Sequence, residues 1–259
     1  MPSKNGLTKS NIEYLNYTWS FYTGCKQYAI LGANGKPVCA VGRERCWANT
    51  VITRFHDNYP NGFNPTFYPE RLMDPIKQKI PARIGVAFMG DLGGSWVDPG
   101  SDCFMSILPG LKLRDAVFSV IEQCPQHQFL FLSKTPGNWR KWGKWPENAW
   151  VGGTSTGTNY DEVLHALANV NASHKWVSFE PLISWNIGKI DDLAGGLLVA
   201  NIKWLVIGTM TPVRAYTQPR IEWVREIITA ASIVNVAVYI KSRLQKVGWP
   251  VERKELPVK

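Results

Sequence analysis

Residues 127–136 read HQFLFLSKTP, in which the apolar run 129–132 is followed at once by the polar pair Ser133 and Lys134. An apolar run without polar alternation predicts a strand buried on both faces, as in parallel sheets covered by helices. The polar pair would then stand at the carboxyl end of the strand, where β/α barrels place their chemistry. This stretch predicts an α/β fold and indicates where its functional residues lie.

The same pattern recurs along the chain. Further strand-like apolar runs cover residues 14–19, 84–89, 149–152, 175–179, 204–207 and 236–240. Helical periodicity covers residues 47–55, 113–124, 160–170 and 221–234. About seven β-α units with right-handed crossovers predict a partial (β/α) barrel of about six to seven parallel strands. Residues 1–259 are expected to form one domain, with segment 58–79 as an excursion at its surface.

The residues that follow the predicted strands would share one mouth of such a barrel. They are Cys25, Asp91, Ser133, Lys134, Thr154, Ser155, Glu180, Gly208, Thr209 and Lys241. They come from distant parts of the sequence, so their convergence depends on the predicted fold. This mouth is the expected functional site.

The composition indicates a globular protein that uses its thiols for chemistry or packing. An odd number of cysteines, 5 among 259 residues, argues against a disulfide framework. The polar first residues lack the apolar centre of a signal peptide, and no apolar run reaches the ~18 residues of a membrane span. We therefore expect a cytoplasmic protein without membrane contact.

The chain is basic and rich in tryptophan, with a net charge of +9 and 12 tryptophans. In segment 138–145, NWRKWGKW, tryptophans alternate with arginine and lysine. Such interleaving suits phosphate backbones and stacked bases, so it favours nucleic acid or a nucleotide as a partner. The alternative is that the tryptophans belong to the core or to a lid and that the charge maintains solubility.

Three cysteines lie close together near the start of the chain. Thirteen residues separate Cys25 from Cys39, and six separate Cys39 from Cys46. Structural zinc normally takes four ligands from closely spaced pairs, which this segment lacks. A three-cysteine iron–sulfur cluster, whose remaining iron can take a non-protein ligand, fits the spacing better. Cys103 and Cys124 are expected to be packing or surface thiols.

Segments around these cysteines and further along the chain carry a resemblance to a known protein family. In order along the chain, the segments that carry it are TWSFYTGC (18–25), CWA (46–48), MGDL (89–92), HQFLFLSKTP (127–136) and FEPL (179–182). They resemble a phage- and archaea-associated three-cysteine family of radical S-adenosylmethionine (SAM) proteins, most of whose members are uncharacterised. That family is distantly similar to spore photoproduct lyase. The resemblance runs from about Trp19 to Lys241.

The resemblance implies a [4Fe–4S] cluster held by Cys25, Cys39 and Cys46, with 25–46 as the cluster-binding loop. SAM would chelate the open iron, and one electron from an external reductant would cleave it to methionine and a 5′-deoxyadenosyl radical. That radical would abstract a hydrogen atom from the substrate. Family members usually place two residues between the last two cysteines. The six residues here add ~1 kcal/mol or less of loop-closure cost.

Polar residues at the strand ends are candidates for binding SAM. They are Asp91, Ser133, Lys134, Thr154, Ser155 and Glu180. Asp91 would accept hydrogen bonds from the amino group, and Lys134, helped by Ser133, would neutralise the carboxylate. The two hydroxyls after strand 149–152 would hold the ribose, and Glu180 would anchor the ribose or the substrate. The ordinary alternatives are a turn capped by Asp91 and a solvated Lys134. Glu180 is expected to be buried with a partner whether or not it binds a ligand.

Together these features predict a radical SAM enzyme that acts on nucleic acid or a nucleotide-like substrate, by base modification or lesion repair. One alternative keeps the cluster but makes a peptide or a small metabolite the substrate. Another alternative, from a different class, is a non-catalytic nucleic-acid-binding module stabilised by zinc or a cluster.

Overall fold

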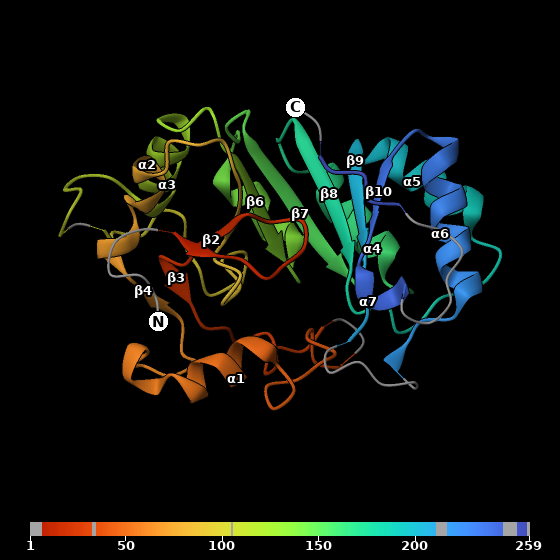
Figure 1. The fold of residues 1–259 in the computed structure, drawn as a ribbon, viewed down its shortest axis with the longest axis horizontal. Helices are drawn as coiled ribbons and strands as arrows, with labels where there is room; N and C mark the ends of the chain where they lie inside the picture. The colour runs from red at the N-terminus through yellow and green to blue at the C-terminus, as the bar shows by residue number, and fades with distance from the viewer. Residues whose placement is uncertain (1–6, 33–34, 105, 211–216, 246–252, 258–259) are drawn as a thin grey trace. The chain divides into compact units, whose positions relative to one another are not determined.

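The fold is taken from a computed structural model, which describes residues 7–32, 35–104, 106–210, 217–245 and 253–257. By its internal contacts the chain divides into two compact units. The first comprises residues 1–150 and 171–173, and the second comprises residues 151–170 and 174–259. Each unit has parallel strands and helices of its own (Figure 1).

Four strands of the first unit are hydrogen-bonded in the order β1-β2-β5-β6. Their bounds are Thr8–Lys9 for β1, Tyr17–Trp19 for β2, Arg83–Val86 for β5 and Gln128–Ser133 for β6. β1 is antiparallel to β2, whereas β2, β5 and β6 are parallel, and Ile84 pairs with Tyr17 on one side and Phe129 on the other. β6 is buried over nearly its whole length. This confirms the strand predicted from HQFLFLSKTP.

Helices and short elements make up the rest of the first unit. They are α1 (Trp47–Arg54), η1 (His56–Asn58), η2 (Pro69–Arg71), α2 (Asp74–Lys77), α3 (Leu113–Glu122), η3 (Pro136–Trp142) and the antiparallel pair β3 (Tyr22–Thr23) and β4 (Thr66–Phe67). In α3 the residues Ala116, Val117, Val120 and Ile121 are buried. Their spacing places them on one side of the helix, which confirms the amphipathic helix predicted there.

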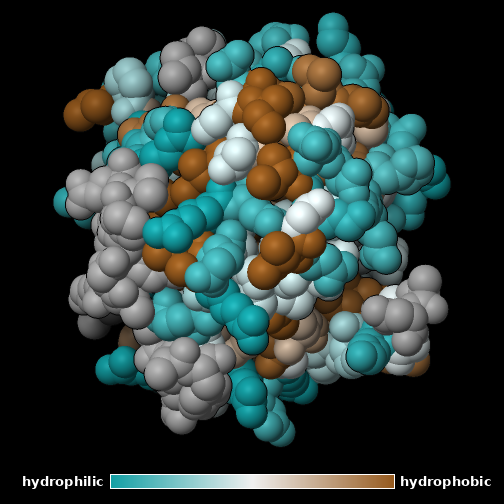
Figure 2. Space-filling view, turned by 90° about the vertical axis from the view of Figure 1, so that its right-hand side faces the viewer, coloured by the Kyte–Doolittle hydropathy of each residue, from teal (hydrophilic) through white to brown (hydrophobic). Residues whose placement is uncertain are grey.

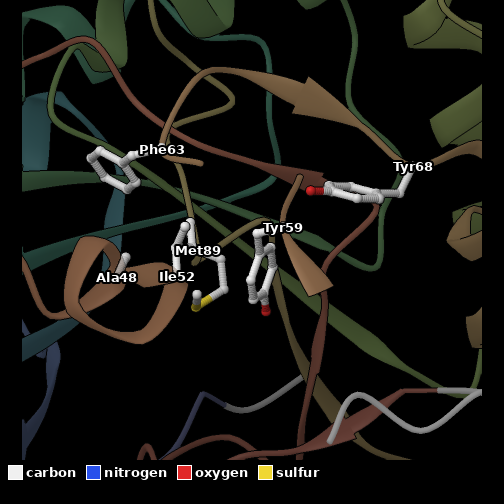
Figure 3. Close-up of a cluster of buried hydrophobic side chains, with 6 residues drawn as sticks. All are labelled: Ala48, Ile52, Tyr59, Phe63, Tyr68 and Met89. Carbon is white, nitrogen blue, oxygen red and sulfur yellow. The ribbon is translucent and has the colours of Figure 1, made fainter. Parts of the chain in front are cut away.

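Segment 58–79 contributes to the core of the first unit, so the prediction of a surface excursion is wrong. One buried cluster comprises Ala48, Ile52, Tyr59, Phe63, Tyr68 and Met89 (Figure 3). Three of these side chains, all aromatic, come from segment 58–79. The segment consists of turns and elements of two to four residues, so no single helical or strand period runs through it and periodicity cannot reveal the burial of these side chains.

Three tryptophans after β6 form a buried aromatic group. Trp139, Trp142 and Trp145 are 0%, 1% and 2% exposed. Trp142 and Trp145 stack with ring centroids 5.4 Å apart, and Trp139 meets Trp145 edge-on at 5.5 Å. The basic residues between them are exposed, namely Arg140, Lys141 and Lys144. Because rings inside a core cannot stack on bases, the core alternative is the right one for these tryptophans.

In the second unit the strands are hydrogen-bonded in the order β7-β8-β9-β10. Their bounds are Ala149–Ser155 for β7, most of which belongs to this unit, His174–Phe179 for β8, Ile202–Ile207 for β9 and Ala237–Ile240 for β10. β8, β9 and β10 are parallel, and Ile207 pairs with Phe179 on one side and Ile240 on the other. The helices of this unit are α4 (Tyr160–Ala168), α5 (Ile190–Val199), α6 (Ile221–Ile233) and α7 (Ser242–Gln245).

The two units confirm the predicted α/β class, and the predicted strands and helices lie within a few residues of the observed ones. Helix α5 was not predicted. Its sequence, IDDLAGGLLV, contains two adjacent glycines, which weaken a helical pattern. In neither unit does the order of the described strands close on itself, so a closed barrel is not seen.

The surface of the second unit exposes a few large apolar side chains at helix ends. Leu198 and Val199 of α5 and Ile233 of α6 are each more than half exposed. Figure 2 shows a face on which apolar and polar side chains are intermixed, as is ordinary for protein surfaces. Among the described residues no helix has both the length and the apolar character that crossing a membrane requires.

Candidate functional site

A glycine with an unusual backbone conformation leads into the first cysteine. Gly24 has a φ of +86°, and a Cβ built on it would lie 2.2 Å from the carbonyl oxygen of Asn64. Its N–H donates to the Met89 carbonyl over 3.1 Å, and its own carbonyl accepts from the Asp91 N–H over 3.3 Å. These bonds hold Cys25 beside the segment that follows β5.

The three cysteines are positioned by short backbone contacts within the loop. The Cys25 Sγ accepts a hydrogen bond from the Gln27 N–H over 3.3 Å, and the Cys39 N–H donates to the Gln27 carbonyl over 3.2 Å. Cys46 is the N-cap residue of α1. Cys39 is buried, whereas Cys25 and Cys46 are half-buried and pack against the cluster of Figure 3. Gln27 thus links the first two cysteines, and α1 positions the third.

Asp91 is buried where β5 ends, and its carboxylate accepts three hydrogen bonds. Oδ1 accepts from the Gly93 N–H over 3.1 Å. Oδ2 accepts from Gln27 Nε2 over 2.9 Å and from the Lys134 N–H over 3.1 Å. The turn-capping alternative is therefore confirmed, and the same side chain also joins the cysteine loop to the segment after β6. Binding of the SAM amino group by Asp91 stays a prediction.

Lys134 interacts electrostatically with all three cysteines. Burial alone lowers the pKa of its ammonium group, but nearby negative charge outweighs burial and raises that pKa above its ordinary value. The contributing groups, strongest first, are Cys39, Asp91, Cys25 and Cys46. Burial, followed by the charge of Asp91, also raises the pKa of the Cys25 thiol to about 12. Without a metal this thiol keeps its proton at neutral pH, and metal binding has to displace it.

Ser133 is occupied by the turn that presents Lys134. The Ser133 Oγ is buried and accepts from the Thr135 N–H over 3.0 Å. The Thr135 hydroxyl in turn donates to the Gly93 carbonyl over 3.1 Å. The hydroxyl of Ser133 therefore supports Lys134 through the backbone, and direct contact with SAM stays a prediction.

The donor groups of the loop can be compared with what a metal centre requires. Among the residues that the structure describes, no three or more His, Cys, Asp and Glu side chains are arranged to hold a single metal ion. A [4Fe–4S] cluster requires a different arrangement. Each cysteine binds a different iron, so the thiolates lie further apart than the ligands of a single metal ion do. By sequence the 25–46 loop contains three thiols and no fourth. Three thiols beside an ammonium group suit, by their chemistry, a cluster with one open iron.

Gln27 is a site residue that sequence reasoning missed. Its side chain is 0% exposed, and its Nε2 donates to Asp91 Oδ2 over 2.9 Å and to Thr135 Oγ1 over 2.7 Å. Its Oε1 is buried and accepts no hydrogen bond from any described residue. A glutamine two positions after a cysteine has no chemical signature of its own. Only its tertiary contacts reveal that it connects three loops.

In the second unit, Thr154 and Ser155 are buried at the end of β7. The Ser155 Oγ donates to Asn159 Oδ1 over 2.9 Å and accepts from the Gly157 N–H over 3.1 Å. Both bonds belong to the turn that leads into α4, so this hydroxyl has a structural task there. Ribose binding by the two hydroxyls stays a prediction.

Glu180 and Lys241 form a half-buried ion pair after β8 and β10. Gly208 follows β9, the strand between them, and a Cβ at this glycine would lie 2.9 Å from the Glu180 Cδ. The glycine therefore leaves the space that the carboxylate occupies. The partner expected for Glu180 is therefore Lys241, and ligand binding by Glu180 stays a prediction.

The predicted site residues thus fall into two groups, one in each unit. The first unit contains Cys25, Cys39, Cys46, Asp91, Ser133 and Lys134. The second unit contains Thr154, Ser155, Glu180, Gly208, Thr209 and Lys241. In the first group, hydrogen bonds and charge connect the cysteine loop with the ends of β5 and β6.

These features define an α/β protein that carries a three-thiol loop at the carboxyl ends of parallel strands. Residues 9–249 match the family described as protein of unknown function (DUF5131). The chain belongs to this family. No curated protein matches the chain, and no solved structure matches it either.

Proposed function

We propose that this chain is a radical SAM enzyme whose [4Fe–4S] cluster is held by Cys25, Cys39 and Cys46. The observation that supports this most is the meeting of the cysteine loop with Asp91 and Lys134 at the carboxyl ends of β5 and β6. In parallel α/β sheets this is the edge at which ligands bind. The proposal includes the partial (β/α) barrel of about six to seven parallel strands predicted from the sequence.

Lys134 balances charge in the proposed site. Because the pKa of its ammonium group is raised, the group stays positively charged at neutral pH. A permanent positive charge near three thiolates offsets their mutual repulsion, and it can also pair with the carboxylate of SAM. The turn closed by Ser133 and Thr135 holds the backbone that presents this side chain.

Asp91 has one acceptor position left for a ligand. A carboxylate offers about four lone-pair positions. Three of them receive protein donors, from Gly93, Gln27 and Lys134. The remaining position can accept the amino group of SAM, in addition to the structural role of Asp91.

Such a cluster, when bound, supplies the electron that cleaves SAM to methionine and a 5′-deoxyadenosyl radical, which abstracts a hydrogen atom from a substrate. The task of the chain is to bind the ligands and to limit access of water. Cys39 is buried, and Cys25 and Cys46 pack on apolar side chains. The expected partner is an external one-electron reductant.

The decisive experiment is anaerobic reconstitution with iron and sulfide, followed by incubation with SAM and dithionite. We expect about four iron and four sulfide ions per chain, brown charge-transfer absorbance and release of 5′-deoxyadenosine. Cys25→Ala should lose most of the iron, whereas Cys103→Ala, which changes a thiol outside the loop, should retain it. A wild-type protein that takes up no iron, or a Cys25→Ala protein with unchanged iron, refutes the proposal.

As its substrate we propose a nucleic acid or a nucleotide-like molecule, for base modification or lesion repair. The support is the net charge of +9 and the exposed side chains of Arg140, Lys141 and Lys144. The buried tryptophans beside them lend no support. Because lysines that contact phosphates release counterions, binding should weaken with salt.

A charge reversal tests this substrate class. The double change Lys141→Glu and Lys144→Glu should weaken binding of a labelled single-stranded oligonucleotide. It should also reduce the magnitude of the slope of log affinity against log salt by about 1.4, which is about 0.7 for each lost phosphate contact. The control is Lys203→Glu, at an exposed position in the second unit. Equal binding by wild type and the double variant contradicts the assignment.

A further inference from the structure

Only one orientation of the buried Gln27 amide is compatible with its hydrogen-bond partners. Its Nε2 donates to Asp91 Oδ2 over 2.9 Å and to Thr135 Oγ1 over 2.7 Å. The Thr135 hydroxyl gives its own proton to the Gly93 carbonyl over 3.1 Å, so it accepts from Gln27. Turning the amide over would place Oε1 against the Asp91 carboxylate, with two acceptors facing each other. Nε2 therefore faces Asp91, and both of its protons are used.

The other end of the same amide has no donor. Gln27 is 0% exposed, and no residue that the structure describes donates to its Oε1. The remaining polar groups of Gln27 are satisfied, since its N–H donates to the Cys25 Sγ and its carbonyl accepts from the Cys39 N–H. Leaving a buried acceptor unpaired is costly. This leaves one acceptor without a donor in an otherwise complete set.

We infer that Gln27 Oε1 accepts a hydrogen bond from an ammonium group of the ligand bound at the cysteine loop. Under the proposed function, on which this inference rests, that group is the amino group of SAM. A cationic donor is favoured because the Asp91 carboxylate and the Cys25 sulfur contact the same glutamine. Gln27 then determines specificity for the amino group of the ligand.

The test compares SAM with its desamino analogue, in which hydrogen replaces the amino group. Equilibrium dialysis against the anaerobically reconstituted full-length protein gives a Kd for each, and the ratio of the two Kd values measures recognition of the amino group. Gln27→Met keeps the side-chain length but removes the acceptor. It should reduce this ratio about tenfold, the worth of one charge-assisted hydrogen bond, with the iron content unchanged.

Two further variants separate ligand contact from loop shape. Thr135→Val removes the other hydrogen-bond partner of Gln27 Nε2 but leaves Oε1 in place, so the ratio should stay at the wild-type value. Gln27→Glu keeps an acceptor oxygen, while its protonated oxygen can donate to Asp91, so it should also retain the ratio. Where Gln27→Met fails to fold, these two variants keep the inference falsifiable, because loss of the ratio in either of them overturns it.

The possible negative results distinguish failure of this inference from failure of the proposed function. An iron-loaded Gln27→Met protein with the wild-type ratio overturns the inference, and so does loss of the ratio in Gln27→Glu or in Thr135→Val. Wild-type protein that binds iron but does not discriminate SAM from its desamino analogue overturns the inference and the amino-group role of Asp91, while the proposed cluster stands. Wild-type protein that takes up no iron refutes the proposed function, and the inference falls with it.

Discussion

The backbone N–H of Lys134 donates a 3.1 Å hydrogen bond to Asp91 Oδ2, which joins the segment after β6 to the segment after β5. The same oxygen accepts from Gln27 in the cysteine loop. One buried carboxylate therefore connects three loops that are far apart in the sequence. Because its acceptors are shared, changing this one side chain affects all three loops.

Asp91→Asn should lower the free energy of unfolding by about 1–3 kcal/mol. An amide has one acceptor oxygen in place of two, and its NH2 group would face a protein donor. Urea denaturation measures the change. The control is Asp98→Asn, an exposed residue that accepts from the Gly100 N–H over 2.9 Å, and it should change stability by about 0.5 kcal/mol or less. Equal effects of the two changes would show that the network adds no stability.

Gly24→Ala should destabilise the first unit severely, by about 4 kcal/mol or more. The residue has a φ of +86°, and the added Cβ would lie 2.2 Å from a backbone oxygen that cannot move freely. Gly35→Ala is a matched control, because Gly35 has a φ of +70° but nothing within 4 Å of the added Cβ. It should cost only the conformational strain, about 1–2 kcal/mol. Similar midpoints in thermal unfolding of the two variants would contradict the steric argument.

Lys175 should stabilise the protein more as the pH rises into the alkaline range. Its buried ammonium donates to the carbonyls of Leu167 and Val170 over 3.0 and 3.4 Å, and burial, followed by the charge of Lys203, lowers its pKa below 10.5. The folded state then releases this proton at a lower pH than the unfolded state does. The free energy of unfolding therefore rises between the folded pKa and the unfolded pKa.

The quantity to measure is the difference in unfolding free energy between wild type and Lys175→Met. Denaturant titrations at a series of pH values, from neutral to about pH 10.5, provide it. This difference should move in favour of the wild type as the pH increases. The same comparison with Lys144→Met, at an exposed position, should be flat. A flat profile for Lys175→Met as well would disprove the burial effect.

Glu180 and Lys241 should be energetically coupled. Each of Glu180→Gln and Lys241→Met leaves a half-buried group without its partner and should cost about 1–3 kcal/mol. The double variant should be less destabilised than the sum of the two, by about 1 kcal/mol or more. The exposed pair of Lys189 and Asp192, 2.6 Å apart, provides the control cycle and should show no measurable coupling. Additive losses at Glu180 and Lys241 would contradict the prediction.

Much of the secondary structure was predictable because the apolar pattern of a strand or helix is a local property. The buried strand β6 and the polar pair after it are found where HQFLFLSKTP predicts them. The wrong or missing predictions concern segments whose burial or secondary structure does not follow from the local apolar pattern. Segment 58–79 is made of turns and very short elements yet buries aromatic side chains, and the two glycines of α5 weaken its helical pattern. The tryptophans near β6 face the core although charged residues surround them in sequence.

By itself the sequence determined the α/β class, the strand ends and the three cysteines that most strongly suggest a metal centre, since these follow from residue type and period. Only the tertiary structure decided which side chains meet. Parallel pairing of β5 with β6 brings Asp91 to the Lys134 backbone, and β8, β9 and β10 bring Glu180 to Lys241. The role of Gln27 in the site also follows only from its tertiary contacts. Hydrogen-bond partners far apart in the sequence depend on strand register, which no local pattern encodes.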